Sequence, residues 1–276
     1  MATLGILHPG SMGAALAANA VEAGNTVLWA SQGRSDPTAV RARRAGATDV
    51  GSVASLCERS AVVLSICPPA AAEAVAREVA ATGFSGCYVD ANAIAPGRMR
   101  AVADTLHGAG ATVVDGGVIG RPPRERGTTR LYLAGEGAQQ VAKLFAAGPV
   151  EVTVLERPIG TASALKMAYG ASTKGAVALS SLCLAMAKQH GVLDELAAEW
   201  DRVDPDATAG ARRRVAAGVP KAWRWVGEMH EVADTAVDSG LPDGFHRSAA
   251  ALFERWAQHR DVDVDIDVAI AELPRR

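Results

Sequence analysis

The sequence predicts an α/β protein, with an N-terminal doubly wound parallel sheet and then an all-α C-terminal domain that begins with a long interdomain helix. Two observations predict this class. Continuous apolar runs alternate with Ala-rich helical segments in the first half, which is typical of parallel strands covered on both faces. After Arg157 the strand pattern stops and only helical segments follow. Since 276 residues are enough for two domains, we expect them at 1–157 and 158–276.

The expected strands are short apolar runs bounded by glycine, proline or polar residues. Pro37 begins one of the expected helices, at a position where its missing N–H costs nothing. The expected strands are 4–7, 27–29, 62–66, 88–90, 112–115, 131–133 and 150–155. The expected helices are 11–23, 37–45, 70–81, 96–107 and 138–146, followed by the long interdomain helix at 161–189.

The composition is that of an ordinary globular protein, with 49% hydrophobic and 21% charged residues. The formal charge of -2 gives no reason to expect nucleic acid as a partner. The longest apolar run, 175–187, is shorter than the roughly 20 residues that a membrane-spanning helix needs, and the N-terminus lacks the features of a signal peptide. The four cysteines are dispersed and form no metal-binding pair. We therefore expect a cytoplasmic protein without a metal, membrane or nucleic-acid partner.

A glycine-containing loop follows the first expected strand, where the phosphate-binding loop of a nucleotide-binding fold would lie. Residues 8–13 read His-Pro-Gly-Ser-Met-Gly and precede a helix. A Gly-x-Gly-x-x-Gly loop lets the backbone approach a pyrophosphate at the helix N-terminus, and here His8 replaces the first glycine. The position of the loop indicates a Rossmann domain, in which we expect His8 to cap the turn rather than to act in catalysis. The expected cofactor contacts of the loop are Gly10, Ser11, Met12 and Gly13.

The segment after the second expected strand indicates which cofactor binds. Enzymes that use NAD usually carry an acid there for the ribose 2′-hydroxyl, but this chain has no acid before Asp36. Ser31, Arg34 and Ser35 are suited instead to a 2′-phosphate, because one charge-assisted hydrogen bond contributes about 1.5–3 kcal/mol. We therefore expect NADP(H), and a solvated basic loop is the alternative. The other expected cofactor contacts, after the strand at 62–66, are Cys67 and Pro68.

Three further segments, taken together with the loop, carry a family resemblance. They are 90–96 (Asp-Ala-Asn-Ala-Ile-Ala-Pro), 115–120 (Asp-Gly-Gly-Val-Ile-Gly) and 160–170. In this order and spacing they resemble the β-hydroxyacid dehydrogenase superfamily, which includes 3-hydroxyisobutyrate dehydrogenases, 6-phosphogluconate dehydrogenases and imine reductases. The remainder of the chain resembles a branch with a 6-phosphogluconate dehydrogenase-like C-terminal domain.

The resemblance implies an NADP(H)-dependent oxidoreductase that transfers a hydride between NADPH and a small carbonyl or hydroxyl substrate. It also implies that Lys166 is the general acid/base and that Asn92 helps to place the substrate. Tyr169 could assist proton transfer or merely pack. The alternative functions are imine reduction and NADP(H) sensing without catalysis. Imine reductases commonly replace the lysine, so its presence favours carbonyl chemistry.

The chain departs from the superfamily at the expected substrate site. Tyr169 and Gly170 replace a polar pair that follows the lysine, and Ile119 replaces a serine. His246 could act from a partner subunit, or it could be a surface residue. The substrate contacts that we expect are Gly117, Ile119, Thr173 and His246.

The long helix at 161–189 also bears on the oligomeric state. It is apolar over most of its circumference, and a helix of that kind needs burial on all sides. Fewer than 90 residues follow it to provide cover. The resembled enzymes are dimers, so we expect a homodimer.

Overall fold

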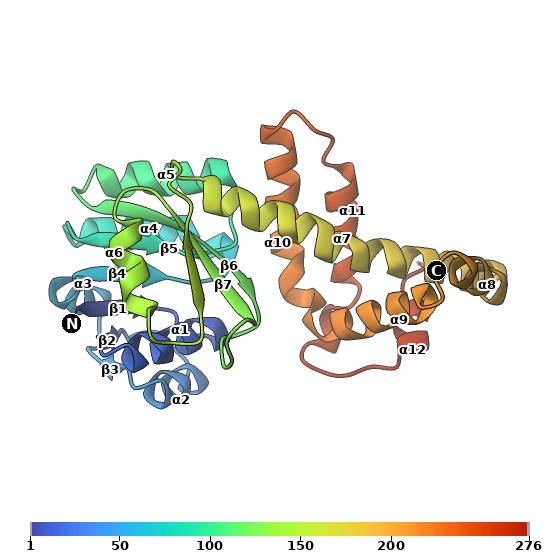
Figure 1. Ribbon diagram of the computed structural model, residues 1–276, viewed down its shortest axis with the longest axis horizontal. Coiled ribbons are helices and arrows are strands. Elements are labelled where there is room, and N and C mark those ends of the chain that lie inside the picture. Colours follow the sequence, from blue (N-terminus) through green and yellow to red (C-terminus); the bar gives the residue numbers. More distant parts are fainter. Residues whose placement is uncertain (1, 275–276) are drawn as a thin grey trace. The chain divides into compact units, whose positions relative to one another are not determined.

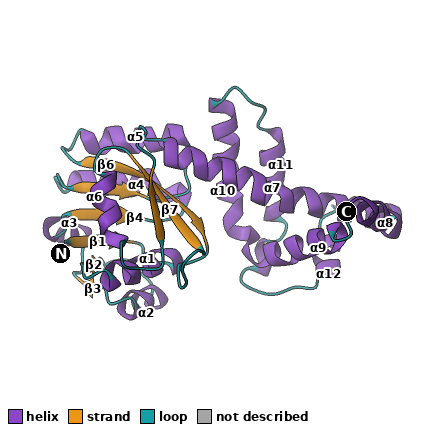
Figure 2. Cartoon of the chain, viewed as in Figure 1, coloured by secondary structure: helices purple, strands orange, loops and turns teal. Residues whose placement is uncertain are grey.

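In the computed structural model, which describes residues 2–274, one eight-stranded sheet lies in the N-terminal part of the chain (Figures 1 and 2). The strands are β1 (Thr3–Leu7), β2 (Thr26–Trp29), β3 (Thr48–Asp49), β4 (Val62–Ser65), β5 (Cys87–Asp90), β6 (Thr112–Gly120), β7 (Thr129–Ala134) and β8 (Glu151–Val154). Their order in the sheet is β3-β2-β1-β4-β5-β6-β7-β8. The strands from β3 to β6 are parallel, β7 is antiparallel to β6, and β8 is parallel to β7. The first three strands are added towards one edge of the sheet and the later ones towards the other edge, so the strand order reverses between β1 and β4.

Helices connect the parallel strands, as the alternating pattern predicts. They are α1 (Ser11–Glu22), α2 (Asp36–Arg44), α3 (Val53–Arg59), α4 (Ala72–Ala81), α5 (Pro96–His107) and α6 (Ala138–Ala142), with short 3₁₀ turns η1 (Pro69–Ala71) and η2 (Lys143–Phe145). Two of these elements, β3 and α3, are absent from the elements expected from the sequence. Both are too short to give a periodic apolar pattern.

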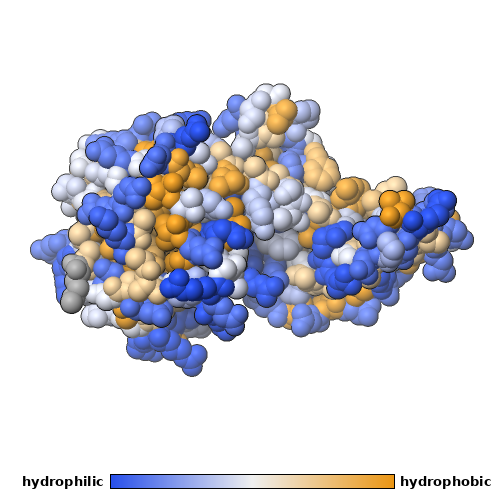
Figure 3. Space-filling view, viewed as in Figure 1, coloured by the Kyte–Doolittle hydropathy of each residue, from blue (hydrophilic) through white to orange (hydrophobic). Residues whose placement is uncertain are grey.

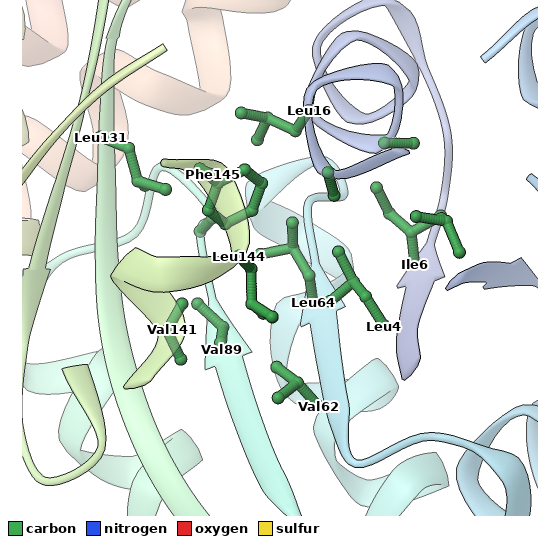
Figure 4. Close-up of a cluster of buried hydrophobic side chains, with 14 of the residues drawn as sticks. Leu4, Ile6, Leu16, Val62, Leu64, Val89, Leu131, Val141, Leu144 and Phe145 are labelled. Atoms are coloured by element: carbon green, nitrogen blue, oxygen red, sulfur yellow. The ribbon is translucent and has the colours of Figure 1, made fainter. Parts of the chain in front are cut away.

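An apolar core lies on each face of this sheet, because successive side chains of a strand point to opposite faces. On one face Leu4 and Ile6 of β1 pack in a cluster with Leu16 of α1 and Phe145 of η2 (Figure 4). The cluster on the other face contains β4, α3, α4 and α5 side chains, among them Leu56, Val63, Val79 and Met99. Burying one large apolar side chain contributes about 1.5–3 kcal/mol. Two such cores account for the doubly wound arrangement, and this part of the fold prediction is confirmed.

The remaining elements are helices (Figure 2). They are α7 (Thr161–His190), α8 (Leu193–Val203), α9 (Ala207–Gly218), α10 (Ala222–Asp238), α11 (Gly244–Glu254) and α12 (Ile266–Ala271), with 3₁₀ turns η3 (Val219–Lys221) and η4 (Ala257–His259). Trp225 of α10 packs edge-on against Phe253 of α11, with 5.4 Å between ring centroids. Trp256 anchors α12 by donating a hydrogen bond from Nε1 to the Ala269 carbonyl (2.9 Å). Among the helices within residues 2–274, none is long and apolar enough to cross a membrane.

The chain divides into two units, which we call the sheet unit (up to Met167) and the helical unit (from Ala168). The division falls later than the boundary expected after Arg157. The first residues of α7 belong to the sheet unit because they are hydrogen-bonded to β6. α7 then continues into the helical unit.

Candidate functional site

The loop between β1 and α1 depends on a close approach of helix to strand. A Cβ atom on Gly13 would lie 2.8 Å from Ile66 Cγ2 and 2.9 Å from the His8 carbonyl oxygen. No side chain fits there, so Gly13 is what lets the helix begin against the strand ends. His8 adopts φ 62°, a left-handed conformation that is uncommon outside glycine. Its carbonyl accepts a hydrogen bond from the Gly10 amide (2.7 Å), so the tight turn forms although the first glycine of the motif is missing.

The N-terminus of α1 is open to a negatively charged group. Gly10 occupies the N-cap position and provides no side-chain acceptor for the amides of the first turn, which contains no acidic residue. A Cβ atom on Gly10 would meet only the His8 carbonyl oxygen, at 4.0 Å. Ser11, the first helical residue, is exposed. Uncapped amides and the positive end of the helix dipole favour an anion here, and the geometry fits a pyrophosphate.

Arg34 acts electrostatically on this loop from the turn after β2. Its amide donates a hydrogen bond to the Ser31 carbonyl (3.0 Å). Burial lowers the pKa of His8 to about 4, and the positive charge of Arg34 adds to the effect. The same charge partly opposes the rise in the pKa of the Cys67 thiol beyond β4. The charge of Arg34 thus acts on residues that follow both β1 and β4.

A second arginine, Arg41 of α2, contacts the loop directly, and the sequence analysis missed it. Its Nε donates a hydrogen bond to the Pro9 carbonyl (3.3 Å). Its Nη2 donates to the Thr38 hydroxyl (2.9 Å), which also hydrogen-bonds to Ser35 Oγ (3.1 Å). The signal in the sequence is the spacing of Thr38 and Arg41, which lie one helical turn apart. Two guanidinium groups and two hydroxyls therefore lie beside the loop.

Asn92 positions protein backbone instead of lying open to a substrate. Its side chain is buried, and its Nδ2 donates to Asp90 Oδ2 (2.8 Å) and to Ser65 Oγ (3.2 Å). Its Oδ1 accepts a hydrogen bond from the Cys67 amide (2.6 Å). Because an asparagine amide has two protons and both are donated, none is left for a substrate. In this structure the Asn92 side chain fixes the loop after β4, and its expected role in placing the substrate stays a prediction.

Cys67 is likewise occupied by the protein. Its amide is paired with Asn92, and burial raises the pKa of its thiol to about 11. The cofactor contact expected of Cys67 stays a prediction. Pro68, the next residue, is exposed at the start of η1.

Asp115 on β6 caps the N-terminus of α7 from within the sheet. Its Oδ2 accepts hydrogen bonds from the amides of Gly160 (2.9 Å) and Ala162 (2.8 Å). Its Oδ1 accepts from the amide (3.1 Å) and the hydroxyl (2.7 Å) of Ser163. Burial raises the pKa of this carboxyl, and these hydrogen bonds, that of the Ser163 hydroxyl first, act in the opposite direction. One carboxyl group thereby satisfies the amides at the start of a 30-residue helix.

Lys166 follows one turn later and bonds to the same strand. Its Nζ donates a hydrogen bond to the Val118 carbonyl oxygen (2.6 Å). The helix can come this close because Gly117 has no side chain. A Cβ atom at this position would lie 2.6 Å from the Ala162 carbonyl oxygen. Gly117 is therefore covered by α7, and the Ile119 side chain is buried. Both residues pack within the protein here, and the substrate contacts expected of them stay a prediction.

The remaining candidates belong to the helical unit. Tyr169 is 49% exposed, and its carbonyl accepts a hydrogen bond from the Thr173 hydroxyl (2.8 Å). The His246 ring lies edge-on to Phe245, with 5.1 Å between ring centroids. Its Nδ1 is buried and has no hydrogen-bond partner among the described residues, and burial lowers its pKa. Tyr169 and Thr173 lie on α7, whereas His246 lies on α11.

The fold and the loop define a dinucleotide-binding protein of the Rossmann class. The family model for the NAD binding domain of 6-phosphogluconate dehydrogenase matches residues 3–148. The chain belongs to this family, which supports an oxidoreductase. A second model, for a domain of unknown function (DUF1932), matches residues 187–256. No curated protein matches the chain.

Solved structures agree with this assignment over nearly the whole chain. A conserved protein of unknown function, described as similar to 3-hydroxyacid dehydrogenases, is 26% identical, with 93% of this chain and 97% of that chain covered and a TM-score of 0.72. Mycobacterium tuberculosis 3-hydroxyisobutyrate dehydrogenase, solved with L-serine, is 18% identical, with both chains covered completely and a TM-score of 0.74. An imine reductase from Streptomyces aurantiacus is 21% identical, with 99% and 100% covered and a TM-score of 0.56. The last two likenesses show the fold alone.

Replacing Asp115 with alanine should destabilise the protein. The change leaves the amides of Gly160, Ala162 and Ser163 without their acceptor in a buried place, so we expect the free energy of unfolding to fall by about 2–3 kcal/mol. Urea denaturation measures it. Asp104→Ala, which removes an exposed carboxylate from α5, is the control and should change stability by less than about 0.5 kcal/mol. Equal effects of the two substitutions would contradict the capping role.

Proposed function

We propose that the protein is an NADP(H)-dependent dehydrogenase or reductase of small carbonyl or hydroxyl compounds, with Lys166 as its general acid/base. The observation that carries the proposal is the anchoring of Lys166 Nζ on the Val118 carbonyl. This contact fixes an ammonium group on the strand that directly follows β5 in the sheet. NADP(H), when bound, supplies or accepts the hydride. Acid–base chemistry at the substrate oxygen is then what the protein must supply.

Lys166 is suited to that role by its hydrogen bonding. An ammonium group has three donors, and the Val118 carbonyl orients the group by accepting one of them. In the reductive direction Lys166 donates a proton to the substrate oxygen as it becomes an alkoxide. In the oxidative direction the neutral amine removes the hydroxyl proton. Holding the group on a packed strand and helix reduces the positional freedom that would slow proton transfer.

The preference for NADP(H) over NAD(H) rests on the charges beside the loop. The turn after β2 lacks a carboxylate for the ribose 2′-hydroxyl. Arg34 and Arg41 approach from that turn and from α2, and Ser35 and Thr38 add hydroxyl groups. A 2′-phosphate accepts charge-assisted hydrogen bonds from such a set. The residues between β2 and Asp36 include no carboxylate, which is the group that would favour the unphosphorylated ribose.

Removing either arginine should reduce the preference for the phosphorylated cofactor. We expect Arg34→Ala and Arg41→Ala each to weaken NADPH binding by about ten- to a hundred-fold, which corresponds to about 1.5–3 kcal/mol for a charged hydrogen bond. NADH binding should change little. Calorimetric titration of both cofactors measures the affinities.

Arg44→Ala is the matched control, because Arg44 is an exposed arginine on the same helix. It should leave both affinities within about two-fold. Equal affinity of the unaltered protein for NADPH and NADH would overturn the proposed cofactor preference.

Turnover tests the reaction and the role of Lys166. With NADPH we expect reduction of small aldehydes or ketones to exceed reduction of cyclic imines. Lys166→Met should lower kcat by about 10²–10⁴-fold, because general acid–base catalysis is lost in the transition state. NADPH affinity should stay near normal, since the phosphate loop is a different segment. Lys188→Met, which removes an exposed lysine from the same helix, should retain turnover.

Near-normal turnover of Lys166→Met would refute the acid/base role and would bring Tyr169 forward. Faster reduction of imines than of carbonyls would assign the protein to the imine reductases. NADPH binding without turnover of either panel would indicate a sensor.

We also propose that the protein is a homodimer and that the helical unit provides its interface. Leu179, Leu182 and Met186 on α7 are about half exposed and recur at helical spacing. Phe245 of α11, also half exposed, lines an apolar groove of about 330 Å³ together with Leu179 and Leu182. On the face shown in Figure 3, apolar residues interrupt the hydrophilic surface of this unit. Contiguous apolar surface of this kind marks interaction sites.

A charge placed on this surface should separate the subunits. Leu182→Glu would bury an unpaired carboxylate in the interface, so we expect light scattering to report a monomer at micromolar concentration where the unaltered protein is a dimer. Val203→Glu, at an 87% exposed position of α8, should leave the dimer intact. A monomeric unaltered protein would refute the proposal.

A further inference from the structure

His8 is unusual in both its backbone and its side chain. It holds φ 62° at the place where dinucleotide loops have their first glycine. A side chain in this conformation is strained, and such strain tends to persist at functional sites. The turn itself needs only the His8 carbonyl, which pairs with the Gly10 amide. The imidazole is therefore not required to close the turn.

The imidazole is held in a place that disfavours its charged form. Its Nδ1 is buried and has no hydrogen-bond partner within residues 2–274. Burial and the charge of Arg34 lower its pKa to about 4, so the ring is neutral at physiological pH. A buried ring nitrogen without a partner is costly. The protein thus keeps a strained and neutral histidine at the start of this loop, with one ring nitrogen unpaired among residues 2–274.

The charged groups around His8 all favour an anion at this place. Arg34 acts on it from the turn after β2, and Arg41 of α2 binds the neighbouring Pro9 carbonyl. The first turn of α1 carries no acidic residue and presents its uncapped amides. Cys67, which follows β4, adds no negative charge. The pKa of its thiol is raised to about 11, so the thiol is uncharged at neutral pH. A bound phosphate would be the negative charge that this positive set lacks.

We propose that His8 is a dinucleotide-binding residue whose imidazole takes up a proton when the phosphate groups of NADP(H) bind. The inference rests on the proposed function, because it assumes that NADP(H) occupies the loop. An opposite charge within about 4–6 Å raises the pKa of a histidine by about 1–3. The imidazole of the complex would then titrate near pH 5–7. Binding would place a negative charge beside the ring, and proton uptake would make the imidazole a charged donor to the phosphate groups.

Such coupling makes NADP(H) affinity depend on pH. If a proton is taken up on binding, the affinity for NADP(H) must rise as the pH falls. This dependence holds over the pH range in which the free histidine is neutral and the bound histidine is protonated. For His8 this range extends from the pKa of the imidazole in the complex down to about pH 4, where the free imidazole becomes protonated. The 2′-phosphate of NADP(H) also titrates near pH 6, so the contribution of His8 must be obtained as a difference between the unaltered protein and His8 variants.

Calorimetric titration of NADP⁺ at pH 6 in two buffers of different ionisation enthalpy counts the protons exchanged on binding. We expect the unaltered protein to take up about 0.1–0.9 proton more than His8→Gly or His8→Asn. Glycine restores the residue of the usual motif, and asparagine tolerates positive φ without titrating. His107→Asn, which removes an exposed histidine from α5, should exchange as many protons as the unaltered protein.

Equal proton counts for the unaltered protein and the two His8 variants would overturn the inference and leave the proposed cofactor in place. Absence of NADP⁺ binding to the unaltered protein would overturn both. If the variants fail to bind or fold, NMR titration of the histidine ring signals of the unaltered protein decides. One signal that titrates near pH 4 without NADP⁺ should titrate at least one pH unit higher with it, and an unchanged titration would refute the inference.

Discussion

The buried carboxyl group of Asp115 is the constraint on which the rest of the candidate site depends. It lies on β6 and accepts hydrogen bonds from the amides of Gly160, Ala162 and Ser163, which begin α7. The negative charge also lies at the positive end of the helix dipole. Because the start of α7 is fixed to β6 in this way, Lys166 comes one turn later within reach of the Val118 carbonyl. The position of the ammonium group follows from a cap that is distant in sequence.

The N-termini of α1 and α7 differ in whether a side chain of the protein caps their first amides. The amides at the start of α7 are satisfied by Asp115 from within the protein. Those at the start of α1 have no side-chain cap and follow a glycine with open space before it. The four orphan amides of a helix must be paired by side chains, water or a ligand. The capped start of α7 therefore serves to position Lys166, whereas the uncapped start of α1 can bind an anion.

The sequence was sufficient to predict seven of the eight strands and their doubly wound arrangement, since each follows from local apolar runs. It was not sufficient for side chains whose partners are distant. Asn92 stands at a strand end, as a substrate contact would, but Ser65 and Cys67 use its amide. Gly117 is covered by α7. Arg41 was missed because its contact with the loop depends on how α2 packs. The pattern locates a residue on an element but does not show which hydrogen bonds it has already formed.

The charge balance at the carboxyl edge of the sheet explains how acids and a phosphate site can coexist there. Asp90, the last residue of β5, is paired in register with Asp115 of β6. Burial raises the pKa of Asp90 to about 7 and also raises that of Asp115. Asp90 is therefore partly protonated near neutral pH, and the charge of Asp115 is taken up by the amides of α7. The negative charge at this edge is thus reduced or already compensated, and Arg34 and Arg41 are left to set the positive potential that an incoming dinucleotide meets.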